Sequence, residues 1–263
     1  MTDGPELRPA ATVMLLRDAH DGGIEVLMVR RAVAAAFAGG IYVFPGGAVD
    51  AADRTPEIGA LVSGLDDVAA SQRLGVPSGG LAYWVAAIRE CFEEAGLLLA
   101  HPADAQPVPS AIDGERWAVH RGELSMVELC RRHGVLLDAG ALRYVSHWVT
   151  PVGEVARRFD TRFFLAAAPD GQEGRHDDAE LVDSRWVAPT DALAAFDRGE
   201  LVLMHPTEAN LRFIADCATV AEALAHADDT GPPPRIEPRI RRDAEGKMVG
   251  IALPDDPAYD DLG

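Results

Sequence analysis

Three glutamates lie within about one helical turn of one another in the segment RECFEEAG, residues 89–96. Glu90, Glu93 and Glu94 are spaced i, i+3 and i+4, so on an α-helix their carboxylates share one face. Like charges at this spacing repel one another. Hard divalent cations such as Mg²⁺ or Mn²⁺ prefer clustered oxygen ligands and would neutralise that repulsion. The spacing therefore predicts a metal site.

The rest of the same segment supports an amphipathic helix from Gly80 to Ala95. Apolar residues recur on the face opposite the glutamates: Trp84, Ile88, Cys91, Phe92 and Ala95. Gly96 follows where a helix commonly ends in a glycine. Arg89 precedes Glu93 by four residues and can orient its carboxylate. The alternative is an ordinary solvated acidic face, which is the usual meaning of a lone acidic pair.

A second segment, Phe44-Pro45-Gly46-Gly47, follows a short strand predicted at residues 41–44. Its proline and glycines bend the chain and let the backbone approach a ligand closely. Asp53 stands six positions after Gly47, and residues 54–88 separate it from Arg89. We interpret residues 54–79 as an insertion, with weak helical periodicity between Leu65 and Leu74.

Together the two segments resemble the Nudix signature: a glycine, an acid six positions later, then Arg-Glu, an apolar residue, any residue, Glu-Glu, any residue, Gly and an apolar residue. The second half is matched by Arg89, Glu90, Cys91, Glu93, Glu94, Gly96 and Leu97. The first half departs from the pattern, because Asp53 replaces the usual glutamate and the spacing to Arg89 is much longer.

The long insertion resembles one Nudix subgroup, the coenzyme A and acyl-coenzyme A diphosphatases of organelles. Two further segments carry that resemblance, HWVTP at residues 147–151 and RFDTRFF at residues 158–164. It extends from about Ala11 to Ala225. The fold it implies is α/β (α+β), a mixed β-sheet sandwiched between α-helices. The alternation of predicted strands and helices favours the same class.

The resemblance implies a pyrophosphohydrolase that cleaves a diphosphate linkage with Mg²⁺ or Mn²⁺. Glu90 and Glu94 would hold the metal, and the Gly47 carbonyl would add an oxygen. Glu93 would complete the metal site or, with Glu90, position or deprotonate the attacking water, beside Arg89 as a further catalytic residue. Coenzyme A or acyl-coenzyme A is the first substrate hypothesis. The alternatives are an ADP-ribose- or NADH-type dinucleotide pyrophosphatase and a nucleotide sensor without catalysis.

Three residues are predicted to bind substrate: Arg162, Arg158 and Phe44. The two arginines, with Arg157, could bind outer phosphates in an otherwise acidic protein, although pairing with protein carboxylates is about as plausible for each. In some Nudix enzymes a downstream glutamate acts as base, and the sequence does not distinguish among Glu173, Asp178 and Glu180. His147 and Trp148 are candidates to contact a base, but a tryptophan in a strand is more often in the core.

Residues 1–230 are interpreted as one domain, with a helical cap at about 112–134 that contains helices near residues 115–119 and 125–133. Residues 231–263 would form a Pro-rich linker and a C-terminal hairpin of residues 236–241 and 249–253. Further expected elements are strands at 11–16, 24–30, 97–100, 142–149, 159–168 and 180–187, and helices from Thr190 to Arg198 and from Thr207 to Ala225. Thr190 and Thr207 are expected to be N-caps.

Composition limits the partners. The chain has 263 residues and a net charge of −18, which disfavours contact with nucleic acid polymers or anionic membranes. The sequence contains no long apolar segment and no leader-like N-terminus, and its three scattered cysteines fit a reducing compartment. We therefore expect a cytoplasmic protein that acts on a small-molecule diphosphate, with no membrane partner. A homodimer is left open.

Overall fold

An antiparallel hairpin begins the described part of the chain. The structure is a computed structural model that describes residues 6–31, 41–103, 110–153, 157–172 and 181–262. Strands β1 (Leu7–Asp18) and β2 (Ile24–Arg31) pair with Leu16 opposite Val26. The turn between them passes through Gly22 and Gly23, both at positive φ, a conformation that glycine adopts without strain. The hairpin predicted from the sequence is confirmed.

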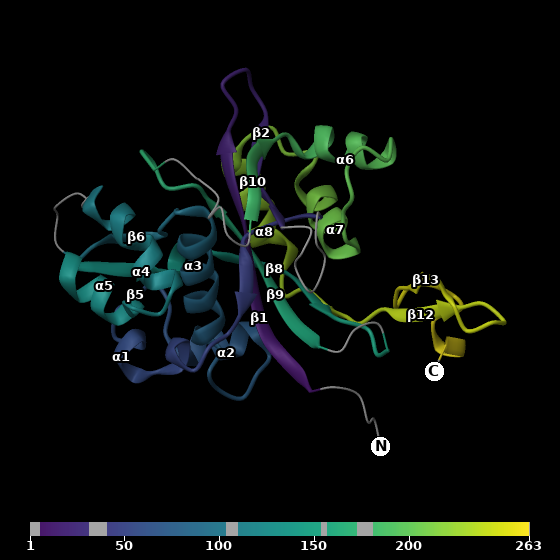
Figure 1. Cartoon of the computed structure of the whole chain (residues 1–263), viewed down its shortest axis with the longest axis horizontal. Coiled ribbons are helices and arrows are strands. Elements are labelled where there is room, and N and C mark those ends of the chain that lie inside the picture. The colour runs from purple at the N-terminus through teal and green to yellow at the C-terminus, as the bar shows by residue number, and fades with distance from the viewer. Residues whose placement is uncertain (1–5, 32–40, 104–109, 154–156, 173–180, 263) are drawn as a thin grey trace.

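Eight strands of the described chain form one mixed sheet (Figure 1). Its path is β10-β2-β1-β9-β8-β11, while β3 pairs with β2 and β4 pairs with β1. The central β1 and β9 run parallel, with Ala11 opposite Arg162, and β8 and β9 run antiparallel. The six further strands are β3 (Tyr42–Val43), β4 (Gly46–Ala48), β8 (Arg143–Val149), β9 (Arg158–Ala167), β10 (Leu181–Val187) and β11 (Arg235–Ile236).

Helices cover both faces of this sheet (Figure 1). On one face, α3 (Leu81–Ala95) packs against Ala11, Val13 and Leu15 of β1. On the other, Met14 and Leu16 belong to a second core with three helices: α6 (Pro189–Asp197), α7 (His205–Ile214) and α8 (Val220–Thr230). This alternation along β1 is what a strand buried on both faces requires. The predicted mixed sheet between helices is confirmed.

The insertion and the helical cap lie together beside α3. The 3₁₀ turn η1 (Ala52–Arg54) leads into the insertion, which contains α1 (Pro56–Gly59), β5 (Val62–Ser63) and α2 (Asp67–Leu74). The cap region contains β6 (Ala100–Pro102), η2 (Ser110–Glu115), α4 (Arg116–His120), α5 (Met126–His133), β7 (Val135–Asp138) and η3 (Ala139–Ala141). Strands β5, β7 and β6 form a small sheet that joins the two segments.

Two predicted elements differ from the structure. The strand expected at 97–100 is wrong, because the backbone of Leu98 bonds to a side chain and not to a neighbouring strand. Its N–H donates to Gln172 Oε1 at 2.8 Å, and its carbonyl oxygen accepts from Gln172 Nε2 at 3.1 Å. The single helix expected from Thr207 to Ala225 is two helices, α7 and α8. Thr219 caps the second by accepting from the Glu222 N–H at 3.1 Å, so the chain restarts the helix there.

The two predicted N-caps are also wrong. Helix α6 has Ala188 at its N-cap, with Pro189 at the first helical position, and α7 has Met204 at its N-cap. In both cases a proline favours an earlier start, since its fixed φ suits the first turn and it has no N–H to be left unbonded. Thr207 is consequently free of a capping role and is buried inside the first turn of α7.

The C-terminal hairpin consists of β12 (Arg239–Arg242) and β13 (Met248–Ala252), followed by η4 (Asp260–Leu262). Before the hairpin, β11 pairs in parallel with β8, with Arg235 opposite His147, so the chain after the prolines returns to the main sheet. The hairpin projects from one end of that sheet (Figure 1). None of the described helices is long and apolar enough to cross a membrane.

Candidate active site

Helix α3 presents the glutamates near its C-terminal end. The helix ends at Gly96, whose φ of 72° allows the left-handed conformation of a C-terminal cap. Arg116 of α4 donates hydrogen bonds to the main-chain oxygens of Glu93, at 2.9 Å, and Glu94. A guanidinium at this position also balances the negative end of the helix dipole. The cap region therefore fixes the turn that carries the glutamates, a role for Arg116 that no motif indicated.

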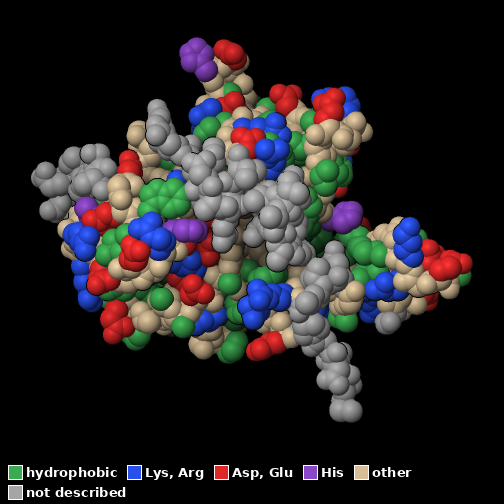
Figure 2. Space-filling model, viewed as in Figure 1, with side chains coloured by type: hydrophobic (Ala, Val, Ile, Leu, Met, Phe, Trp, Pro, Cys, Tyr) green, Lys and Arg blue, Asp and Glu red, His purple; other side chains and the backbone are tan. Residues whose placement is uncertain are grey.

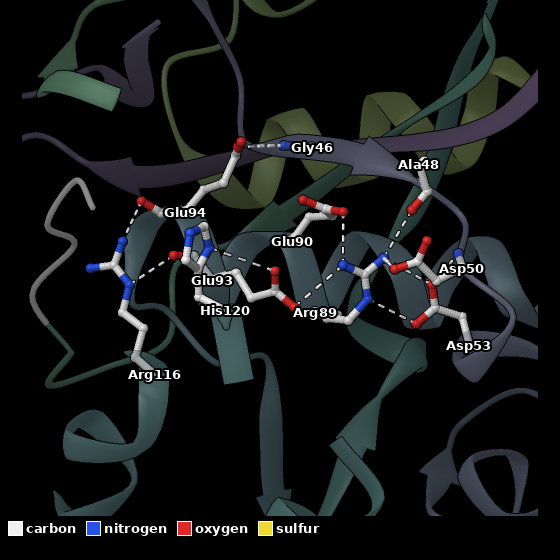
Figure 3. Close-up of polar contacts among 10 residues, drawn as sticks. All are labelled: Gly46, Ala48, Asp50, Asp53, Arg89, Glu90, Glu93, Glu94, Arg116 and His120. Atoms are coloured by element: carbon white, nitrogen blue, oxygen red, sulfur yellow. Dashed lines mark hydrogen bonds and ion pairs between the residues drawn. The ribbon is translucent and has the colours of Figure 1, made fainter. Parts of the chain in front are cut away.

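Arg89 lies between the glutamates and the loop before the insertion and connects the two (Figure 3). Its Nε and Nη2 donate to the two carboxylate oxygens of Asp53, each at 2.9 Å. Its Nη2 also donates to the Ala48 oxygen at 2.9 Å, and its Nη1 donates to Glu90 at 2.8 Å and to Glu93 at 3.3 Å. Asp53, whose role the sequence left open, is thus the buried counter-ion of Arg89.

Glu90 and Glu94 lie against the glycine pair of β4, and Figure 3 shows the contact between Glu94 and Gly46. The Gly46 N–H donates to Glu94 Oε2 at 2.9 Å. At Gly47 the backbone lies so close to Glu90 that a Cβ would come within 2.5 Å of that carboxylate. The Phe44-Pro45-Gly46-Gly47 bend therefore brings main chain against the helix face, as the sequence predicted for a close approach. Glu90, Glu93, Glu94, Arg89 and Gly47 are brought together.

Burial dominates the electrostatics of these carboxylates. Burial raises the pKa of Glu90 to about 7, against the lowering effect of Arg89 and with the raising effect of Glu93. Burial raises the pKa of Glu93 as well, again against the opposing effect of Arg89. The pKa of Arg89 is raised. Desolvation lowers it, but the hydrogen bonds to Asp53 and the charges of Glu90, Asp53 and Glu93 raise it by more. The site concentrates more negative charge than Arg89 compensates.

His120 of α4 adds a further titratable group on the side of the cap. Its Nδ1 lies 3.9 Å from Glu93 Oε2, beyond hydrogen-bond distance, and is buried without a hydrogen-bond partner in the described part of the chain. The ring also packs edge-on against Trp117, with the centroids 5.9 Å apart. His120 was missed because it lies outside the signature and reaches Glu93 only through the fold of the cap.

A pocket of about 360 Å³ opens beside the glycine pair, on the opposite face of the sheet from α3. Gly46, Gly47 and Phe44 line it together with residues of β1, β8, β9, α7 and the C-terminal hairpin. Its polar lining groups include Thr12, Thr150, Thr161, His205 and Thr207; none of the described lining residues is Asp, Glu, Lys or Arg. It is therefore suited to an uncharged, mainly apolar part of a ligand.

Of the three predicted substrate-binding residues, Phe44 lines the pocket and the two arginines do not. Phe44 is 2% exposed and lines the pocket. Arg158 is buried, donates to the Thr150 oxygen at 2.9 Å and pairs with Glu237. Arg162 is buried beside Asp160 and His147. Both arginines thus have partners inside the protein, and their binding of phosphate stays a prediction. Trp148 is 5% exposed and lies in the core, which is the more common position of a tryptophan in a strand.

The candidate general bases Glu173, Asp178 and Glu180 lie outside the described residues. Within the described part of the chain, no three His, Cys, Asp or Glu side chains are grouped closely enough to enclose a metal ion. The donor chemistry nevertheless fits a hard divalent cation. Carboxylates share one helix face beside the half-buried main chain of Gly46 and Gly47, and burial raises the pKa values of Glu90 and Glu93. A cation there would offset the excess negative charge.

The comparison with known families identifies the class of protein. A family described as NUDT19 Nudix domain matches residues 66–213, which is more than half of the chain. The chain is also similar to a NUDIX hydrolase from Alicyclobacillus acidocaldarius whose crystal structure is known, with 31% identity, a TM-score of 0.65, and coverage of 84% of this chain and 96% of that one. The chain belongs to the Nudix hydrolase family.

Within that family the similar curated proteins are acyl-coenzyme A diphosphatases named NUDT19. The human protein is 28% identical over 250 residues, covering 82% of this chain and 67% of the relative. The protein of Gallus gallus is 33% identical over 221 residues, covering 69% of this chain and 58% of the relative. This chain therefore spans roughly three fifths to two thirds of the length of these two relatives.

Proposed function

We propose that the chain hydrolyses the diphosphate linkage of coenzyme A or acyl-coenzyme A. The observation that carries the proposal is that the glutamates on α3 and a mainly apolar pocket both adjoin the Gly46–Gly47 strand. The names of the similar NUDT19 proteins support the substrate class. Coenzyme A joins a nucleotide to an uncharged pantetheine limb through a diphosphate, which matches charged and apolar regions side by side.

The proposed residues keep the roles that the resemblance implied. Glu90, Glu94 and the Gly47 carbonyl would hold Mg²⁺ or Mn²⁺, with Glu93 completing the site. A bound divalent cation would neutralise the diphosphate oxygens and acidify the attacking water. Arg89 donates hydrogen bonds to Glu90 and Glu93, and Glu93 would accept a proton from the attacking water. Water attacks one phosphorus, the bridging P–O bond breaks, and the leaving phosphate takes its electron pair.

The cysteines and the net charge bear on location and partners. The cysteines Cys91, Cys130 and Cys217 are unpaired, which supports a reducing compartment and hence the cytoplasm. The strongly acidic chain disfavours nucleic acid polymers and anionic membranes as partners. The proposed chemistry needs no residue from a second copy, so it holds equally for a monomer and a homodimer.

The test is hydrolysis of a panel of diphosphates in Mg²⁺ and in Mn²⁺, with products identified by mass. Coenzyme A should yield 3′,5′-ADP and 4′-phosphopantetheine, and acyl-coenzyme A should yield the acylated phosphopantetheine. The panel also contains ADP-ribose and NADH. Preferential cleavage of either dinucleotide would contradict the substrate assignment, and binding without any cleavage would identify a nucleotide sensor.

A further inference from the structure

The C-terminal hairpin contributes one side of the pocket beside the candidate active site. Pro238, Met248 and Ile251 line the pocket together with residues of the main sheet. Met248 is 41% exposed, so part of its side chain is available to a ligand. On the face shown in Figure 2, apolar side chains extend along the junction between the hairpin and the body. These residues lie outside the segment that resembles the Nudix subgroup and outside the matched residues 66–213.

The hairpin is held against the body at its base. Strand β11 pairs with β8 just before it, and Glu237 accepts a hydrogen bond from Arg158 of β9. The Tyr259 hydroxyl donates to the Glu237 oxygen at 2.6 Å, and Arg242 of β12 donates to the Gly153 oxygen at 3.2 Å. These contacts fix the position of β13 relative to the pocket. The position of Met248 and Ile251 is thus a property of the folded chain.

The pocket lining includes a tryptophan, Trp148, that has an unsatisfied hydrogen-bond donor. The residue is 5% exposed and lines the pocket, yet its indole N–H is buried without a hydrogen-bond partner in the described part of the chain. A buried donor left without an acceptor costs free energy, and tryptophan usually finds a partner when buried. An amide or thioester carbonyl of a ligand in the pocket would supply that acceptor.

The pocket and the glutamates both adjoin strand β4. This strand pairs with β1 on one side, and no described strand pairs with its other side. Gly47 approaches Glu90 on the α3 face, while Gly46 and Gly47 also line the pocket. A ligand whose diphosphate lies at the glutamates can therefore pass the side-chain-free edge of β4 and place its next segment in the pocket.

We propose that the pocket binds the uncharged thioester limb of an acyl-coenzyme A, and that Met248 and Ile251 of the C-terminal hairpin determine the preference for the acyl group. The proposal rests on the function proposed above. It assigns to the hairpin a specificity role that the family signature does not carry. The charged nucleotide half fits this pocket less well, because none of the described lining residues is Lys or Arg.

The test uses the whole chain and two readouts. The first is the ratio of kcat/KM for octanoyl-coenzyme A to kcat/KM for coenzyme A. The second is equilibrium binding of S-octanoyl-pantetheine, which has no diphosphate, followed by calorimetry. Met248→Ala and Ile251→Ala should each lower the ratio and weaken thioester binding by about 10-fold, the effect of removing a few methylenes from an apolar site. Met248→Ala changes a partly exposed side chain and should leave folding intact.

Val249→Ala is the matched control. Val249 lies between the two test positions on β13, is 61% exposed and does not line the pocket, so both readouts should stay at the wild-type value. Unchanged readouts in both test variants would overturn the hairpin assignment, as would failure of the wild-type chain to bind S-octanoyl-pantetheine. If the thioester binds and the variants weaken it while no coenzyme A compound is cleaved, the pocket assignment stands and the proposed hydrolysis fails.

Discussion

Arg89 and Asp53 form a buried ion pair across 36 positions of sequence, with both carboxylate oxygens of Asp53 accepting hydrogen bonds at 2.9 Å. Asp53 precedes the insertion and Arg89 follows it, so the ion pair holds together the two parts of the chain that flank the insertion. Arg89 uses its remaining N–H groups on Ala48, Glu90 and Glu93. One guanidinium thus joins the glycine bend, the start of the insertion and the helix that carries the glutamates.

Removing the Asp53 charge should destabilise the fold. Asp53→Asn leaves the Arg89 guanidinium buried without its two-point partner, and we expect a loss of about 3 kcal/mol in the free energy of unfolding. Urea unfolding measures it. Asp50→Asn is the matched control, because the Asp50 side chain is 65% exposed and 3.7 Å from Arg89, and should cost less than about 1 kcal/mol. Equal stability of the two variants would contradict the assigned pair.

The stability of the metal-free chain should fall as pH rises. Burial raises the pKa of Glu90 from 4.5 to about 7, so between these values the folded chain holds a proton that the unfolded chain has released. The free energy of unfolding therefore decreases through this window, by at most about 3 kcal/mol, and is lowest above it. Urea unfolding in EDTA at pH 5 and pH 8 measures the difference. Glu90→Gln should flatten the dependence; an identical slope in both proteins would oppose this account.

Gly47→Ala should damage activity more than stability. Its Cβ would lie 2.5 Å from the carboxylate at the end of the Glu90 side chain, which must move aside and disturb its hydrogen bond with Arg89. A displacement of this size at a reacting group can cost about 100-fold in rate, while we expect the free energy of unfolding to change by about 1 kcal/mol. Turnover of coenzyme A and urea unfolding are measured together.

Gly46→Ala supplies the contrast. A Cβ there would meet main-chain atoms, including the Ala11 oxygen at 2.6 Å, which cannot move without disturbing β1. We expect it to cost about 1–3 kcal/mol of stability. The interpretation of Gly47 is contradicted if Gly47→Ala keeps wild-type turnover, or if its loss of stability matches that of Gly46→Ala.

Local signals predicted the helix that carries the site. Residues Trp84, Ile88 and Phe92 recur at helical spacing, and Gly96 ends the helix, so α3 could be predicted almost to the residue. The hairpin at Gly22–Gly23 was equally local. The start of α7 was missed because Thr207 was given more weight than the proline one position before it.

The contacts that assemble the site are long-range and could not be predicted from spacing. Arg158 pairs with Glu237, which is 79 positions away, and Gln172 satisfies the backbone of Leu98 from 74 positions away. The pocket likewise collects residues from the first strand to the C-terminal hairpin. Sequence patterns indicate which face of one element is buried, whereas the partner of an arginine depends on how distant strands are ordered.

The most direct test of the account is the release of 3′,5′-ADP from coenzyme A in Mg²⁺ by the wild-type chain and by Glu93→Gln. Glu93 lies 3.3 Å from Arg89, and removing its charge relieves repulsion, so the variant should fold like the wild type. Its rate should fall by at least about 100-fold, whereas Glu57→Gln, at an exposed position on α1, should match the wild type. Full turnover by Glu93→Gln would contradict the assignment of this helix face as the catalytic centre.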